Sequence, residues 1–145
     1  MRPPSARTVG LVVGATIVLT AFHFTDNIVN VDTYPRQDFL SATFIQVAGL
    51  IFWPVMASIG VAGYLLYRRG RIPLAHAYLF AFSFIGLVSL GHFTAASPGE
   101  LTTRGLVSVT IDGIMGVAVI AVTLWSILAR RREVGPTVEP TSATG

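Results

Sequence analysis

The sequence contains no cysteine and no lysine, and it carries few charged residues of any kind. The absence of cysteine excludes a disulfide framework, a thiolate metal site and a cysteine nucleophile. Charged residues make up 12% of the 145 residues, about half of the roughly 25% found in an average soluble domain. So few charges cannot coat a water-soluble surface, which argues strongly against a soluble enzyme.

Apolar residues are what the chain has in excess, at 52% of the sequence and a mean hydropathy of +0.68. This composition excludes disorder for the bulk of the chain. A helix that crosses a bilayer needs about 20 mainly apolar residues, and four runs are that long, at about 9–31, 41–67, 72–93 and 106–129. The sequence therefore predicts an all-α integral membrane protein, a four-helix bundle whose transmembrane helices run up-down-up-down within residues 9–132.

The basic residues predict the orientation of these spans. All ten are arginine, and eight lie in the N-terminal tail, the second connection and the C-terminal end: Arg2, Arg7, Arg68, Arg69, Arg71, Arg130, Arg131 and Arg132. Only Arg36 and Arg104 fall on the opposite side. Because loops rich in arginine stay in the cytoplasm, both termini are predicted to be cytoplasmic. Arginine used without lysine suggests a bacterial source, and hence the inner (plasma) membrane.

The segments outside the spans follow from the same boundaries. Residues 1–8 form a predicted cytoplasmic tail, and residues 133–145, rich in Pro, Thr, Ser and Gly, a predicted disordered cytoplasmic tail. A cleaved signal peptide is the alternative for the first run. The residues after its apolar stretch, Thr20–Phe24, offer no small-x-small cleavage site, so we expect an uncleaved span.

Two kinds of partner can be weighed from charge and small residues. A net charge of +3 and a pI near 10 would suggest nucleic acid in a soluble domain, but arginines at the ends of apolar runs indicate the lipid bilayer and no nucleic acid. Glycines mark close helix packing in lipid, and they pair on three runs, as Gly10 with Gly14, Gly60 with Gly63, and Gly113 with Gly116. These faces predict packing within the chain or a homo- or hetero-oligomer.

Polar residues inside the spans are the candidate site. On the first run, steps of three and four residues place one polar stripe on a single face: Thr16, Thr20, His23, Asn27 and Asn30. At 1.5 Å per residue, the histidines and acids of three runs lie roughly 22 to 30 Å above the arginine-rich end. The sequence therefore predicts one outward-facing polar pocket for a ligand, proton or cofactor, lined by His23, Asp26, Asn27, Gln46, His92 and Asp112. His76 lies near the opposite end and does not belong to it.

Four chemistries suit such a pocket. His23, His92 and Asp112 are candidate ligands for a divalent metal, although no HxxxH or HxxE spacing supports a metal site. Haem held by His23 and His92, a proton or ion relay, and a pocket for a lipid or quinone headgroup are the others.

No nucleophile elbow, Walker loop or dinucleotide-binding glycine motif is present in the sequence. The expected function is therefore a non-enzymatic membrane component or ligand-binding module. The alternative is a redox, metal- or haem-binding protein, or a lipid- or quinone-acting enzyme, that uses His23, His92 and Asp112.

Overall fold

The computed structural model describes residues 1–34, 39–95 and 98–133. These ranges are almost entirely helical, with five α-helices and three short 3-10 helices, in the order α1 (Ala6–Val29), η1 (Val31–Thr33), α2 (Ala42–Arg68), α3 (Ile72–Val88), η2 (Ser89–Gly91), α4 (His92–Ala95), η3 (Pro98–Glu100) and α5 (Thr103–Glu133). Four helical segments are long and apolar enough to cross a membrane: Ala6–Val29, Ala42–Arg68, Ile72–Thr94 and Thr103–Arg132. The predicted four-span helical bundle of a multi-pass membrane protein is confirmed.

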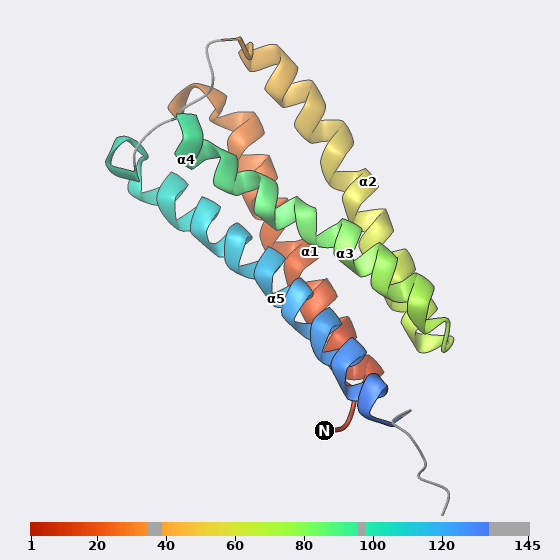
Figure 1. Cartoon of the computed structure of the whole chain (residues 1–145). Helices are drawn as coiled ribbons and strands as arrows, with labels where there is room; N and C mark the ends of the chain where they lie inside the picture. The colour runs from red at the N-terminus through yellow and green to blue at the C-terminus, as the bar shows by residue number, and fades with distance from the viewer. Residues whose placement is uncertain (35–38, 96–97, 134–145) are drawn as a thin grey trace, which may run out of the picture.

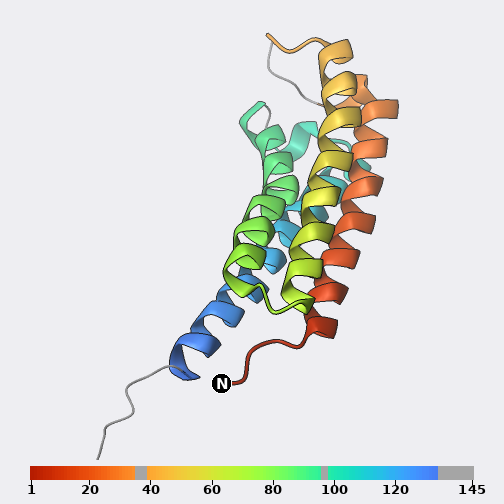
Figure 2. The same ribbon diagram turned by 90° about the vertical axis from the view of Figure 1, so that its right-hand side faces the viewer.

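The four long helices form a bundle in which sequence neighbours are also neighbours in space. α1 packs along α2 and α5, α3 packs along the same two helices, and α1 barely touches α3, which lies diagonally across the bundle. Figure 1 and Figure 2 show the chain start, the α2–α3 connection and the end of α5 together at one end. Gly70 permits that tight connection, because its φ of 73° lies in the left-handed region that favours glycine.

The N-terminal residues are held against the bundle. α1 begins at Ala6, within the predicted tail, because the Ser5 hydroxyl accepts a hydrogen bond from the Thr8 N–H at 3.1 Å. Trp125 Nε1 donates to the Arg2 carbonyl at 3.0 Å, and the Tyr67 hydroxyl donates to the Pro4 carbonyl at 2.8 Å. At the other terminus α5 continues to Glu133. The predicted disordered tail beyond that residue lies outside the described residues.

Close packing of α3 against α5 depends on glycine. A Cβ on Gly86 would lie 2.2 Å from the Asp112 carbonyl oxygen and 2.6 Å from the Gly116 nitrogen, so the two backbones meet there directly. Phe82 packs in the same way over Gly60 of α2, where a Cβ would lie 2.8 Å from its ring. Lipid-facing positions instead carry exposed large apolar side chains such as Val18, as expected where the solvent is hydrocarbon.

The glycine pairs identified in the sequence mostly contact helices of the same chain. Gly60 and Gly63 meet α3, Gly113 meets Leu90, and Gly116 meets α3. On α1 the pair divides, because Gly10 faces the Tyr64 ring of α2 whereas nothing lies within 4 Å of a Cβ on Gly14. An oligomer through these faces stays a prediction.

Candidate functional site

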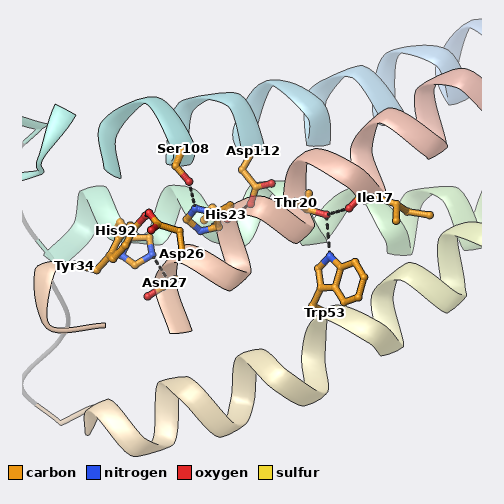
Figure 3. Close-up of polar contacts among 11 residues, drawn as sticks. Ile17, Thr20, His23, Asp26, Asn27, Tyr34, Trp53, His92, Ser108 and Asp112 are labelled. Atoms are coloured by element: carbon orange, nitrogen blue, oxygen red, sulfur yellow. Dashed lines mark hydrogen bonds and ion pairs between the residues drawn. The ribbon is translucent and has the colours of Figure 1, made fainter. Parts of the chain in front are cut away.

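A buried polar cluster lies at the end of the bundle away from the N-terminus. His23 of α1, only 2% exposed, turns both ring nitrogens toward α5. Its Nδ1 is 2.7 Å from the Ser108 hydroxyl, and its Nε2 is 4.0 Å from an Asp112 carboxylate oxygen. Asp112 is fully buried and accepts a hydrogen bond from Ser89. Figure 3 shows His23, Ser108 and Asp112 in the layer between α1 and α5.

His92 extends this cluster toward α1 and η1. Asn27 Nδ2 lies 3.1 Å from His92 Nε2. The ring centroids of His23 and His92 are 5.8 Å apart, with the ring planes nearly perpendicular. The ring centroids of Tyr34 and His92 are 5.1 Å apart. The first and third spans are therefore joined by their histidines, at the common depth that the sequence predicts.

Asp26 ties the end of α1 to its surroundings. Its carboxylate accepts hydrogen bonds from the Tyr34 hydroxyl at 2.5 Å and from Asn30 Nδ2 at 2.7 Å, and Arg104 approaches it to 2.5 Å. Burial, and then the bond to Asp26, raise the pKa of Tyr34 from 10.0 to about 12. With three partners this acid is satisfied by the protein, and it holds η1 and α5 to α1.

A cavity of about 450 Å³ lies beside the histidines, between α1, α2 and the η2–α4 segment. It forms because α2 packs along α3 but diverges from α4, as both ribbon views show. Most of the wall is apolar: Phe24, Ile28, Leu40, Phe44, Ile45, Ala48, Gly49, Phe52 and Val88. The polar part of the wall consists of His23, Asn27, Tyr34, Ser89, His92 and Thr94.

The six residues that the sequence places in one pocket divide into three sets. His23, Asn27 and His92 line the cavity. Asp112 and Asp26 lie behind the wall, where they are bonded to the lining residues Ser89 and Tyr34.

Gln46 is the sixth residue, and it is not part of the lining. Its Nε2 donates to the Ile28 carbonyl at 2.9 Å. This side chain satisfies a carbonyl near the end of α1 and joins α1 to α2.

Sequence reasoning left out several residues of the site. Ser89 and Ser108 had a usable signal, because they lie three residues before His92 and four before Asp112, on the same helix faces. Tyr34 had none, because it follows α1 after a 3-10 turn and helical periodicity does not apply there. It is 4% exposed and buried between Asp26 and His92.

His76 lies at the opposite end of the bundle, as the sequence predicts. Its Nε2 is 2.9 Å from the Ser126 hydroxyl, which is 3.2 Å from the Tyr67 hydroxyl. Because Tyr67 donates its proton to the Pro4 carbonyl, this second cluster joins α2, α3 and α5 to the N-terminal segment. It is separate from the cavity.

In the part of the chain that the structure describes, the side chains do not assemble a metal or bis-histidine haem site. Among the described residues, no group of three or more His, Asp or Glu side chains is placed to hold a metal ion. Two axial histidines must each point an in-plane nitrogen at one iron. Both ring nitrogens of His23 instead face Ser108 and Asp112, and His92 Nε2 faces Asn27, so these two rings do not point nitrogens at one shared position.

Ser108, His23 and Asp112 are the residue types of a nucleophilic triad. In a working triad, however, the serine hydroxyl must be accessible to the substrate. Ser108 is not part of the cavity lining, so a ligand in the cavity does not meet its hydroxyl. Ser89 does line the cavity, and its hydrogen-bond partner is a carboxylate rather than a histidine. Ser108 therefore supports the lining residue His23, and Asp112 supports the lining residue Ser89.

Comparison with known proteins yields no match, whether with protein-family models, curated proteins or solved structures.

Proposed function

We propose that the protein is a non-enzymatic, membrane-embedded binding module for an amphipathic small molecule, with an apolar ring or chain and an oxygen-bearing head like that of a quinone or lipid. The cavity carries this proposal. Its volume of about 450 Å³ lies in the range of roughly 300 to 1,000 Å³ typical of small-molecule sites. An apolar wall with a few polar groups on one side matches such a ligand in shape and polarity.

The place of the cavity in the bundle supports the same proposal. Its walls come from three of the four membrane-spanning segments. Because α2 diverges from α4, the wall that α2 contributes is separated from the wall formed by the η2–α4 segment. A ligand dissolved in the bilayer therefore reaches the site from the side. The arginine-rich end faces the cytoplasm in this proposal, by the same rule that orients other multi-pass proteins, and the cavity lies near the outer surface of a bacterial plasma membrane.

One observation favours the alternative, in which the site performs redox or lipid chemistry. Ser89 joins the cavity wall to Asp112, which lies 4.0 Å from His23, so a bound ligand is one hydrogen bond from an acid–histidine pair. This alternative predicts a bound chromophore or metal in protein purified from its native membrane. An absorption spectrum and elemental analysis that show neither would remove its cofactor-dependent forms.

The two tryptophans allow a direct test of binding. Trp53 follows the lining residue Phe52, whereas Trp125 bonds to Arg2 at the other end. We expect 10-bromodecanol, whose bromine quenches indole fluorescence on contact, to quench Trp53 saturably in the Trp125→Phe variant. Quenching of Trp125 in the Trp53→Phe variant should rise linearly, by partition alone. Equal, linear quenching at both sites would refute a binding cavity.

A filled cavity provides the second arm of this experiment. Ala48 lines the cavity, whereas its neighbour Val47 is 51% exposed and is not part of the lining. In the Trp125→Phe background, Ala48→Phe should abolish saturable quenching, and Val47→Phe should leave it unchanged. Loss in both variants, or in neither, would count against the cavity as the binding site.

A further inference from the structure

The hydroxyl groups of the cavity wall all donate their protons to other parts of the protein. Ser89 donates to Asp112, Tyr34 donates to Asp26, and Thr94 donates to the Gly91 carbonyl at 2.7 Å. A hydroxyl has one proton and two lone pairs. Each of these oxygens is therefore left with acceptor capacity alone.

Asn27, His92 and His23 are the remaining polar groups of the wall. Asn27 Nδ2 can only donate, so His92 Nε2 accepts its hydrogen bond, and the neutral His92 ring then carries its own proton on Nδ1. Asn27 Oδ1 is buried and has no hydrogen-bond partner among the described residues. In Figure 3 the Asn27 amide lies on the α2 side of the cluster, away from α5. Both nitrogens of His23 are turned toward Ser108 and Asp112.

The cavity thus offers a ligand mainly acceptors, and two carboxylates stand directly behind two of them. A bound hydroxyl group can donate to such a wall. A carbonyl or ether oxygen instead meets the lone pairs of other oxygens, and buried acceptors are left unsatisfied, which is costly in a low-dielectric site.

We propose that the ligand is an apolar compound recognised through a hydroxyl group that donates a hydrogen bond, such as a long-chain alcohol or a hydroquinone, in preference to its carbonyl or ether counterpart. This inference rests on the proposed binding function and adds the chemical class of the ligand. Asn27 Oδ1 and the Ser89 hydroxyl oxygen are the acceptors that it assigns.

A matched pair of probes tests the inference. 10-bromodecanol and its methyl ether share the same chain and bromine, and they differ in one hydroxyl proton. With the Trp125→Phe variant, we expect the alcohol to bind about tenfold more tightly than the ether, because a lost hydrogen bond to a buried acceptor has about that effect. Equal affinity, or tighter binding of the ether, would overturn the inference and leave the binding function standing. If neither probe shows saturable quenching, both proposals fail.

Two variants locate the recognising acceptor. Asn27→Leu keeps a similar volume and removes the orphaned oxygen, so the alcohol should lose most of its advantage over the ether while the ether still binds. Asn27→Asp keeps an acceptor at that position and should retain a preference for the alcohol. A preference that persists undiminished in Asn27→Leu would contradict the assignment of Asn27. Helical circular dichroism checks that both variants are folded.

Discussion

Asp26 is the residue on which the loop after α1 depends. It is 4% exposed and gathers Tyr34, Asn30 and Arg104 around one carboxylate. Hydrogen bonds to a charged group contribute about 1.5 to 3 kcal/mol. Because Tyr34 is buried and Arg104 has a side chain 61% exposed, the tyrosine bond is worth more than the ion pair, which water screens.

Removal of that hydroxyl group is the first prediction. Tyr34→Phe should lower the free energy of unfolding by about 1 to 3 kcal/mol, because Asp26 loses a buried donor. Thermal unfolding in detergent, followed by circular dichroism, measures the change. Tyr78→Phe is the matched control, since Tyr78 is exposed and its hydroxyl loss should change little. Equal effects of the two substitutions would show that the Asp26 bond adds nothing to stability.

The raised pKa of Tyr34 predicts how stability depends on alkaline pH. Its pKa is about 12 in the folded protein against an ordinary 10.0, so the folded state holds the phenolic proton more tightly than the unfolded state does. This contribution is fully present below pH 10 and is lost as pH rises from about 10 to 12. The midpoint of thermal unfolding should fall over that interval, and Tyr34→Phe should fall less steeply. Parallel slopes would contradict the shifted pKa.

Helical spacing explains which site residues the sequence could reveal. His23 and Asn27 are four apart on one helix, so they share a face wherever that helix packs, and both line the cavity. Gln46 lies at the right depth, but depth does not determine orientation, and its amide turns to a backbone carbonyl. The role of Tyr34 depends on the course of the chain after α1, which no periodic pattern encodes.

At the scale of elements, the contact between α3 and α5 is the most constrained. Gly86→Ala places a Cβ against the backbone of α5, 2.2 Å from the Asp112 carbonyl oxygen, so the helices must separate. Overpacking of this kind costs about 1 to 3 kcal/mol. Gly14→Ala provides the control, because nothing lies within 4 Å of that position. Thermal unfolding should show a clear loss for the first variant and little change for the second. A neutral Gly86→Ala would mean that the two backbones are not in contact.

The ends and breaks of helices were only partly predictable. Apolar run length places each span to within a few residues, but side-chain caps decide where helices start, as Ser5 does for α1. The third span contains a 3-10 turn at Ser89–Gly91, where the sequence predicts continuous helix. With about three residues per turn instead of 3.6, that turn alters the direction in which His92 points. Periodicity alone cannot anticipate such a local change.

The whole fold was the most predictable level, because it follows from length and solvent. Four apolar runs that each match the thickness of a bilayer leave few arrangements other than an up-down bundle. The cavity was not predictable, because it arises where α2, which packs along α3, diverges from α4. The angle between those helices depends on how their surfaces pack. The height of each polar residue along its helix indicated where these residues gather. It did not indicate that a cavity lies beside them.

The proposed orientation of the whole molecule can be tested because the chain has no cysteine of its own. A single introduced cysteine then reports its side of the membrane by its reaction with an impermeant maleimide in intact cells. Arg69→Cys follows α2 and Arg132→Cys lies in the last turn of α5, at the arginine-rich end. Phe39→Cys precedes α2 and Gly99→Cys lies in η3, before α5, at the other end. All four positions are exposed. Since the arginine-rich end should stay cytoplasmic, only the second pair should react before lysis, and all four after it. If Arg69→Cys and Arg132→Cys were labelled on opposite sides of the membrane, the four-span topology would be wrong. If both were labelled in intact cells, the four spans would stand but their orientation would be inverted, and the cavity would open near the cytoplasm.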